Sequence, residues 1–553
     1  FLCTQLMQLG GLNNMAWYDE AVFYHMYPLG MTGAPKQNEY GEPVERLNKL
    51  LPWISHIKNI GCNAIYIGPL FESVGHGYET TDYKKLDSRL GTNEDLKNFV
   101  EECHKNGIRV ILDGVFNHTG RDFFAFKDIK ENRENSQYKD WYCNVNFWGN
   151  NSYNDGFSYE NWGGYDLLVK LNQKNPEVKD YICDVIRFWV SEYDIDGIRL
   201  DAADVMDFNY MKALRYVANE VKSDFWLMGE VIHGDYSRWA NEGTLHSVTN
   251  YMLHKALYSA HNDHNYFEVA HTISYVDRMI GKNLNLYSFV DNHDVERIYT
   301  KLTNKAHFVP VHVMLYTLPG IPALYYGSEF GIEGKKERFS DDSLRPALCY
   351  DDYKNAAKTN ECTKLIAALG KIRQNTPALC YGEYKELELQ TTHFAYARAL
   401  QKKETHSAIK QSYLNHCHTR QQGIMGGSDS FTIVGASGIG KSTAIGRAIS
   451  IITKEQIVEH NGTKIIPYLL VQTPCDASLK GLLLEMLRLV DAILETKYYV
   501  DARRSGSTTD ILIGLVSQVC LNHICVLVID EAQNLLSKNG RNLVNALVQL
   551  INN

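Results

Sequence analysis

What the sequence lacks narrows the classes of protein that it can encode. Its 553 residues contain no run of eighteen apolar residues, so no membrane-spanning helix is expected. The 12 cysteines never form a Cys-x-x-Cys pair, and a chain of this length can bury an adequate core without disulfides. We therefore expect free thiols in a reducing, cytoplasmic compartment. The net charge of −9 indicates no overall attraction to nucleic acid or to an acidic membrane.

The first fourteen residues match neither a signal peptide nor a natural start. The stretch FLCTQLMQLGGLNN does not begin with methionine and has no basic segment before an apolar one. MAWYDEAVFYHMYP, from Met15, reads as a natural beginning. We expect residues 1–14 to be a translated leader that is not native to the protein.

Short apolar segments alternate with helical periodicity from about residue 16 to residue 375. Several of these segments are apolar almost throughout, which is typical of strands covered on both faces. The predicted strands lie at 22–28, 63–70, 109–118, 196–203, 225–231, 247–253, 286–294 and 321–327. Eight strands alternating with helices predict an α/β fold, a (β/α)8 TIM barrel over residues 15–380.

Two features between the strands refine this prediction. Apolar side chains in residues 96–103 recur at helical spacing, and Asn175 before Pro176 predicts a helix N-cap with proline in the first turn. After the third strand, residues 119–165 are rich in Asn, Tyr, Trp and Gly and interrupt the rhythm. We expect them to form an inserted lobe beside the C-terminal mouth of the barrel.

Polar side chains cluster where the predicted strands end, which in a barrel is where chemistry takes place. Arg199 and Asp201 are two residues apart and therefore on one side of a strand, Glu230 is at the end of the next strand, and Asp294 is at the end of a strand two further on. Glycoside hydrolysis needs such a set, because one carboxylate attacks or stabilises the anomeric carbon and a carboxylic acid protonates the leaving oxygen. Helix capping or ion pairing is the competing interpretation.

DGVFNH, GIRLDAAD, GEV and FVDNHD, in this order and spacing, resemble the four signature regions of the α-amylase superfamily, glycoside hydrolase family thirteen. HGYETTDY and LPGIPALYYGSEFG resemble its flanking motifs. The resemblance covers about residues 16–400. It implies a hydrolase of α-1,4-linked starch, maltodextrin or a related α-glucan that needs no cofactor and retains the anomeric configuration through a covalent glycosyl-enzyme.

The resemblance also implies a role for each matching residue. Asp201 becomes the nucleophile, Glu230 the acid/base and Asp294 the stabilising carboxylate, with the first two carboxyls about 5–5.5 Å apart. Asp113 and Asn117 shape the end of their strand, and Asn117 also matches a calcium-ligand position of the family. The implied substrate-binding residues are His76, Tyr78, His118, Arg199 and His293.

Substrate, calcium and domain boundaries follow the same resemblance. YENWGGYDLLVKLN (159–172) is similar to neopullulanase and cyclomaltodextrinase relatives, which favour short maltodextrins, although Val169 replaces their usual proline. We expect the N-terminal module that those relatives often carry to be absent. The Lys-His pair found after the nucleophile in many calcium-binding members is replaced by Ala-Ala-Asp-Val. We expect residues 381–401 to be the truncated start of the family's C-terminal β-domain.

A second set of motifs lies in residues 429–553. The P-loop pattern Gly435-x4-Gly440-Lys441-Ser442 stands between a strand-like FTIV and a helix-like STAIGRAISII, so that backbone N–H groups would hold phosphates. Lys441 would reach the β- and γ-phosphates and Ser442 would bind Mg²⁺. ICVLVIDEAQ resembles a Walker B strand, with Asp530 on Mg²⁺ and Glu531 positioning water. The predicted nucleotide-binding residues are Gly435, Gly440, Lys441, Ser442, Thr443, Asp530 and Glu531.

This second half is similar to the AAA+ ATPases of bacterial transposition, the TniB/TnsC-like group. FTIVGASGIGKSTAIGRAI, PYLLVQTPCDASLKGLLLEMLRLVDAIL and LVIDEAQNL carry the resemblance, which implies ATP and magnesium as ligands and DNA or a transposase as partners. No sensor strand, arginine finger or lid follows, so we expect a partial domain that binds ATP with weak or no hydrolysis. Residues 402–428, polar and basic, are predicted to be a linker.

Two sets of motifs in one chain leave three hypotheses. The first is an α-glucan hydrolase with a passive C-terminal passenger. The second is a DNA-associated ATPase regulator of transposition. The third is a fused open reading frame with no joint function, whose barrel misfolds without its β-domain.

Overall fold

A computed structural model describes residues 16–281, 285–338, 340–399, 457–460, 463–472 and 478–530. The chain divides into two compact units, residues 1–399 and 400–553. The predicted leader, the linker, the P-loop and Glu531 lie outside the described residues. Within these described ranges, every helix is too short or too polar to span a membrane.

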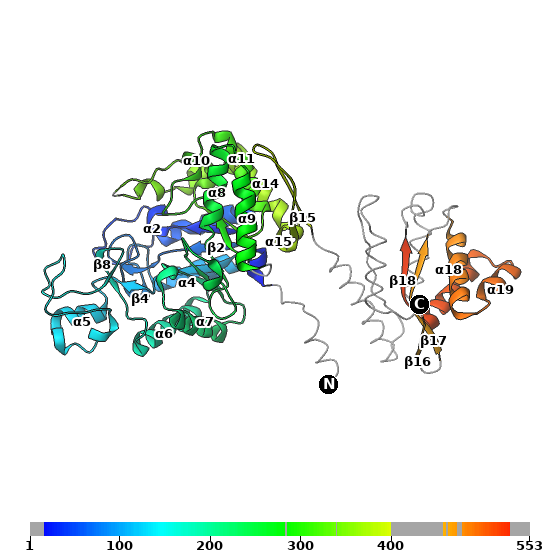
Figure 1. The fold of residues 1–553 in the computed structure, drawn as a ribbon, viewed down its shortest axis with the longest axis horizontal. Helices are drawn as coiled ribbons and strands as arrows, with labels where there is room; N and C mark the ends of the chain where they lie inside the picture. The colour runs from blue at the N-terminus through cyan, green and yellow to red at the C-terminus, as the bar shows by residue number, and fades with distance from the viewer. Residues whose placement is uncertain are drawn as a thin grey trace. The chain divides into compact units, whose positions relative to one another are not determined.

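The first unit is built on a parallel sheet of eight strands (Figure 1). Their hydrogen-bonded order is β11-β10-β9-β5-β2-β1-β13-β12. A parallel bridge between Thr249, just after β11, and Tyr287 in β12 joins the two ends of this order, which makes the sheet a (β/α)8 barrel and confirms the predicted fold. The strands are β1 (Phe23–Met26), β2 (Ala64–Ile67), β5 (Arg109–Gly114), β9 (Gly197–Leu200), β10 (Trp226–Gly229), β11 (Ser247–Val248), β12 (Tyr287–Phe289) and β13 (Ile321–Tyr325).

The strand predicted at 247–253 is shorter than expected. β11 ends at Val248, and helix α8 (Tyr251–Asn262) begins three residues later. Asn250 causes the change, because its side chain accepts a hydrogen bond from the N–H of Leu253 and so caps the helix. The cap places Tyr251 in the first turn of α8, at the mouth of the barrel.

Helices cover the outside of the barrel, and the longer ones, such as α4 and α6, bury an apolar face. In α4, the side chains predicted to lie on one face are all buried, and Thr92 forms a capping box with Asp95. In α6, Asn175 accepts a hydrogen bond from the N–H of Glu177, as its position before a proline predicts. The helices of this unit are α2 (Pro28–Met31), α3 (Leu51–Asn59), α4 (Asn93–Lys105), α5 (Phe124–Asn132), α6 (Pro176–Tyr193), α7 (Phe208–Val221), α8, α9 (Phe267–Ile280), α10 (Ile298–Lys301), α11 (Phe308–Thr317), α12 (Tyr350–Tyr353), α13 (Ala356–Thr359), α14 (Glu361–Gln374) and α15 (Ala378–Tyr381).

Three small sheets surround the barrel. β3 (Phe71–Ser73) and β4 (Thr80–Leu86) form an antiparallel pair, and the loop between them carries His76 and Tyr78. β6 (His118–Thr119), β8 (Tyr165–Lys170) and β7 (Asn161–Trp162) form an antiparallel sheet that, with α5, organises the segment predicted as an inserted lobe. After α15, β14 (Glu383–Leu389) and β15 (Phe394–Ala399) form a hairpin.

The second unit contains a three-stranded sheet and three described helices. β17 (Thr463–Gln472) pairs in parallel with β18 (Ile524–Asp530) and antiparallel with β16 (Val458–His460). The helices α18 (Leu479–Leu494), α19 (Tyr498–Arg504) and α20 (Thr509–His523) connect the parallel strands, which is the α/β connection that two parallel neighbours require. β18 ends at Asp530, the residue predicted to act on Mg²⁺.

Candidate active site

The site follows from the two-residue period of the barrel strands. Aromatic side chains fill the barrel interior, where Phe23 stacks on Trp226 with ring centroids 5.1 Å apart. A side chain two residues further along a strand faces the same side, closer to the C-terminal mouth. This step leads from Ile111 to Asp113 on β5, and Asp113 lies opposite Arg199 in the β5–β9 register. Apolar packing therefore gives way to charged groups one layer higher.

Arg199 joins three of the predicted carboxylates. Its Nη1 lies 2.8 Å from Oδ1 of Asp113 and 3.0 Å from Oδ1 of Asp201. Its Nη2 lies 2.8 Å from Oε2 of Glu230. The guanidinium side chain is 3% exposed, so the three ion pairs are shielded from water. Asp201 and Glu230 are thus fixed by neighbouring nitrogens of one rigid group.

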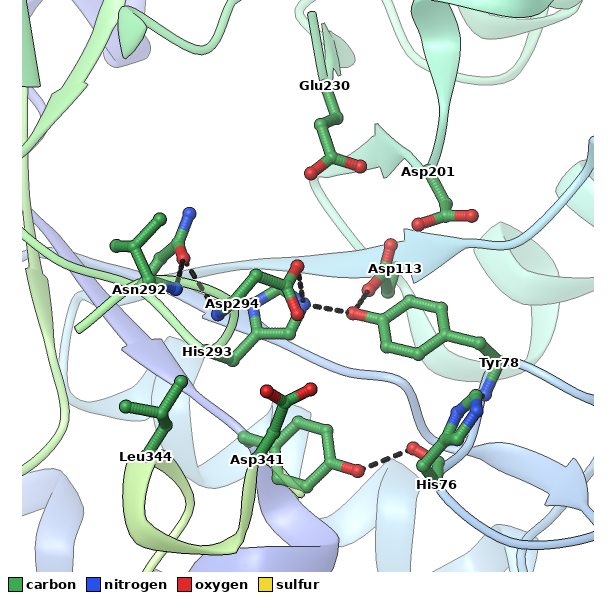
Figure 2. Close-up of polar contacts among 12 residues, drawn as sticks. His76, Tyr78, Asp113, Asp201, Glu230, Asn292, His293, Asp294, Asp341 and Leu344 are labelled. Carbon is green, nitrogen blue, oxygen red and sulfur yellow. Dashed lines mark hydrogen bonds and ion pairs between the residues drawn. The ribbon is translucent and has the colours of Figure 1, made fainter. Parts of the chain in front are cut away.

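A hydrogen-bonded path runs from Asp113 to the third carboxylate (Figure 2). The Tyr78 hydroxyl donates to Oδ2 of Asp113 at 3.1 Å and lies 2.5 Å from Nε2 of His293. This nitrogen lies 3.1 Å from Oδ2 of Asp294. Figure 2 shows the carboxyl groups of Asp201, Glu230 and Asp294 pointing toward a common space.

A second path returns to Glu230 and closes a ring of contacts. Oδ1 of Asn292 accepts the backbone N–H of Asp294 at 2.8 Å, and Nδ2 of Asn292 donates to the Tyr251 hydroxyl at 3.1 Å. That hydroxyl lies 3.3 Å from Oε1 of Glu230. The first path holds four predicted site residues, and Arg199 closes the ring by contacting both Asp113 and Glu230. The sequence motifs did not single out Tyr251 or Asn292.

Burial and charge set the protonation of this ring. Burial raises the pKa of the Asp201 carboxyl well above its usual value; Arg199 opposes the rise, and Glu230 reinforces it. Burial also raises the pKa of Glu230, again opposed by Arg199 and reinforced by Asp294. Because burial and crowded like charges both disfavour ionisation, these two carboxyls hold their protons to higher pH than free carboxyls do. A half-ionised pair of this kind can supply both a carboxylate and a carboxylic acid.

Burial keeps the imidazole and phenol of the ring uncharged. It lowers the pKa of His293 well below its usual range and raises the pKa of Tyr78 well above its own. Both are therefore neutral hydrogen-bonding groups near pH 7. Because these two groups are neutral, the charges at the mouth come from the carboxylates and from the arginines paired with them.

Arg345 holds Asp294 from outside the ring and was not found by the sequence motifs. Its Nη2 lies 2.9 Å from Oδ1 of Asp294 and 3.3 Å from Oδ2 of Asp341, and its Nε donates to the carbonyl oxygen of His293 at 3.1 Å. The guanidinium also lies 4.6 Å from the centroid of the Tyr27 ring. Arg345 lies outside any predicted strand or helix pattern. Only its spacing of four residues from Asp341 could have indicated the ion pair between them.

His76 and His118 flank Tyr78 without joining the ring. The His76 side chain is exposed and pairs with Glu79, while its carbonyl oxygen accepts a hydrogen bond from the Tyr27 hydroxyl at 2.5 Å. His118 is buried, and its Nε2 lies 3.1 Å from the carbonyl oxygen of Tyr78. Burial lowers the pKa of His118 to about 3, so its imidazole is uncharged near pH 7. In this structure His118 supports the loop that carries Tyr78.

The surroundings of Asn117 do not fit a calcium ion. Its Oδ1 accepts a hydrogen bond from Nε2 of Gln173 at 3.0 Å, and the Gln173 oxygen accepts the N–H of Asp207 at 2.7 Å. An amide donor therefore faces the oxygen that a cation would use. Across the described ranges, no group of three or more His, Cys, Asp or Glu side chains is arranged to hold a metal.

Fold and site together define a (β/α)8-barrel protein whose mouth holds four carboxylates, three of them paired with one buried arginine. Comparison with known proteins agrees with this class. Residues 47–378 match the family model described as the catalytic domain of α-amylase, and residues 424–553 match an AAA domain. The chain belongs to the α-amylase family, with an AAA domain in its C-terminal part.

Several characterised proteins are similar to the barrel. The chain is 32% identical over 374 residues to a cyclomaltodextrinase of Thermoanaerobacter pseudethanolicus, covering 64% of each chain. It is 31% identical over 341 residues to a maltogenic α-amylase of Bacillus acidopullulyticus, covering 58% of each. The chain thus spans about 60% of the length of these curated relatives.

Solved structures share the fold of the same part of the chain. A cyclic α-maltosyl-(1→6)-maltose hydrolase from Arthrobacter globiformis is 25% identical, with a TM-score of 0.63, over 70% of this chain and 90% of that chain. A debranching enzyme of Nostoc punctiforme is 28% identical, with a TM-score of 0.62, over 70% and 86%. Both similarities support the barrel architecture.

Proposed function

We propose that the barrel is a retaining α-glucan hydrolase that cleaves α-1,4 links in short maltodextrins. The observation that carries this proposal is the Arg199 guanidinium, which holds Asp201 and Glu230 on adjacent nitrogens while Asp294 faces the same space. This arrangement supports roles for Asp201 as a carboxylate, Glu230 as an acid and Asp294 as a further carboxylate at one sugar ring. Retention requires the first two carboxyls to lie about 5–5.5 Å apart.

In the first step, the Asp201 carboxylate attacks the anomeric carbon and the Glu230 proton passes to the glycosidic oxygen as its bond to that carbon breaks. The product leaves with that proton, and a covalent glycosyl ester remains on Asp201. Arg199 stabilises the charge that Asp201 carries before attack. Asp294, held by Arg345 and His293, is placed to bind sugar hydroxyls and favour the distorted ring of the transition state.

In the second step, Glu230 is ionised and acts as a base. It takes a proton from water, whose oxygen attacks the anomeric carbon and displaces Asp201. The site then returns to its starting protonation, and the product keeps the α configuration.

The names of the relatives support the substrate class. Cyclomaltodextrinase and maltogenic α-amylase both name enzymes of α-glucans or cyclic α-glucans, and the 159–172 segment resembles the same group. We therefore propose linear and cyclic maltodextrins as substrates, in preference to long starch chains.

The test is release of reducing sugar from maltodextrin and β-cyclodextrin by the full chain. We expect activity in the wild type and its loss in Asp201→Asn. Asp184→Asn is the matched control, because Asp184 is 60% exposed and, among the described residues, forms its ion pair with Lys84 at the surface. Wild-type protein that folds and releases no sugar, or an Asp201→Asn variant with full activity, contradicts the proposal.

We propose separately that the C-terminal part binds ATP with Mg²⁺. The AAA-domain match and the parallel strand β18 ending at Asp530 support this. The predicted ligands of nucleotide and metal are Lys441, Ser442 and Asp530. Fluorescent ATP should bind the full chain in Mg²⁺, and Lys441→Ala should abolish binding while Lys497→Ala does not; equal binding by both variants contradicts the proposal.

A role in transposition is the alternative function of this part. It predicts that the full chain binds duplex DNA in an ATP-dependent way, with affinity that falls as salt rises. Binding that does not depend on ATP, or no binding at low salt, favours a passive passenger or a fused reading frame.

We also propose that the protein works in a reducing compartment such as the cytoplasm. The described cysteines are all free thiols, and one relative, from Bacillus subtilis, is named an intracellular maltogenic amylase. Thiol titration of protein purified without reductant should find these cysteines reactive after unfolding; disulfides would contradict the proposal.

A further inference from the structure

Tyr251 makes a contact with the predicted acid/base that neither the motifs nor the family match assigns. It lies in the first turn of α8, and its hydroxyl is 3.3 Å from Oε1 of Glu230. The same hydroxyl accepts a hydrogen bond from Nδ2 of Asn292 at 3.1 Å. A single phenol therefore lies between Glu230 and the loop that carries Asp294.

The hydrogen bonds around Asn292 fix the direction of this contact. Its Oδ1 accepts two backbone N–H groups, of Asp294 at 2.8 Å and of Val295 at 3.1 Å. The amide nitrogen must therefore point the other way, toward Tyr251, where it acts as a donor. Because Asn292 already donates to the Tyr251 oxygen, the proton of Tyr251 is directed at Glu230.

The two oxygens of Glu230 have different partners. Oε2 accepts from Nη2 of Arg199 at 2.8 Å and from the N–H of Ala202 at 3.3 Å. Two N–H donors leave Oε2 little room for a proton of its own. The transferable proton therefore belongs on Oε1, the oxygen that Tyr251 contacts.

We propose that Tyr251 is a positioning residue that aims Oε1 of Glu230 at the glycosidic oxygen and stabilises the carboxylate formed when its proton leaves. This inference rests on the proposed glycoside hydrolysis. As Glu230 gives up its proton, the neutral hydrogen bond from Tyr251 becomes a charge-assisted one and strengthens. Burial raises the pKa of Tyr251 well above its usual value, so the phenol keeps the proton that it donates.

Removing the hydroxyl should therefore raise the pKa of Glu230. The other groups that act on Glu230 stay in place: Arg199 and the N–H of Ala202 lower its pKa, while Asp294 and Asp113 raise it. A hydrogen bond to a charged group corresponds to about one to two pH units, and the length of 3.3 Å puts this one at the lower end. With the ionised form less stable, Glu230 stays protonated to higher pH and becomes a weaker acid.

The experiment measures the pH profile of kcat/KM on maltotriose for wild type, Tyr251→Phe and Tyr193→Phe. Tyr193 is the matched control, because its buried hydroxyl has no hydrogen-bond partner in the described structure. We expect Tyr251→Phe to move the alkaline limb upward by about one pH unit and to lower kcat about tenfold. Tyr193→Phe should leave both unchanged.

A second substrate separates positioning from a loss of packing. An aryl α-maltoside with an acidic phenol as leaving group needs little proton transfer, so Tyr251→Phe should lose far less activity on it than on maltotriose. Equal losses on both substrates, or an alkaline limb that does not move, overturn the inference. A wild type that cleaves neither substrate instead contradicts the proposed function itself.

Discussion

Replacing Arg199 with methionine tests the electrostatic logic of the site most severely. Methionine keeps much of the volume of the arginine stem and removes its charge. In the wild type, Arg199 lies within 3.0 Å of Asp113, Asp201 and Glu230. The substitution leaves these three carboxyls together at the barrel mouth without their cation. Three crowded carboxyls without a cation then have raised pKa values, because each ionised form loses its partner and repels the others.

The size of the effect follows from burial. Breaking a buried ion pair costs about 3–5 kcal/mol near neutral pH. An unfolding entropy of about 2 cal/mol/K per residue gives roughly 0.8 kcal/mol/K for the barrel unit. We therefore expect the midpoint of thermal unfolding to fall by about 4–6 °C at pH 8.

The sign of the pH dependence is the decisive part. Carboxyls whose folded pKa is raised stabilise the fold fully below their unfolded pKa of about 4 and lose this contribution as pH rises through the folded value. The decrease in unfolding temperature of Arg199→Met relative to wild type should therefore be small at pH 5 and largest at pH 8.

Differential scanning fluorimetry of the full chain at both pH values checks this. Arg187→Met is the control, since Arg187 forms an ion pair with Glu220 in which both side chains are more than 40% exposed, and such a pair contributes at most about 1 kcal/mol. A decrease in unfolding temperature that is equal at pH 5 and pH 8 would contradict this prediction.

Three further changes test separate parts of the account. Glu230→Gln removes the transferable proton and should lower kcat on maltodextrin by about 10²–10⁴-fold, a loss that steady-state kinetics would measure; a loss below tenfold would contradict the acid role. Gln173→Leu leaves the buried Asn117 oxygen and the Asp207 N–H without their partner, so we expect a loss of about 2–4 kcal/mol in a denaturant titration, unrelieved by calcium. Wild-type activity and unfolding temperature should be unchanged by EDTA, and a loss that calcium restores would show that a metal site exists after all.

The sequence alone was sufficient for the barrel because its strands and helices differ in period. An apolar run such as 63–70 is typical of a strand that is covered on both faces. The spacing of apolar residues in 96–103 is typical of a helix that buries one face. The strand at 247–253 was predicted too long because β-branched and aromatic residues there match a strand as well. The strand ends because Asn250 caps helix α8 by accepting a hydrogen bond from the N–H of Leu253. The pattern of apolar residues does not indicate such a hydrogen bond.

Part of the candidate site was also within reach of the sequence. Asp113, Arg199, Asp201 and Glu230 lie at strand ends, where the two-residue period fixes the direction of a side chain. Tyr251, Asn292 and Arg345 were not found, because a helix cap and irregular loops set their directions. The hydrogen bond from Gln173 to Asn117 joins residues far apart in the sequence, so no local pattern indicates it. This hydrogen bond weakens the calcium prediction at Asn117.

The proposed retaining mechanism requires Asp201 to form a covalent bond to the sugar. Incubation with a 5-fluoro-α-maltosyl fluoride, whose glycosyl-enzyme hydrolyses slowly, followed by proteolysis and mass spectrometry of the peptides, measures this directly. We expect one added 5-fluoromaltosyl group, located on Asp201, and none in Asp201→Asn. A label on Glu230, or release of a β-configured product with no label at all, would contradict it.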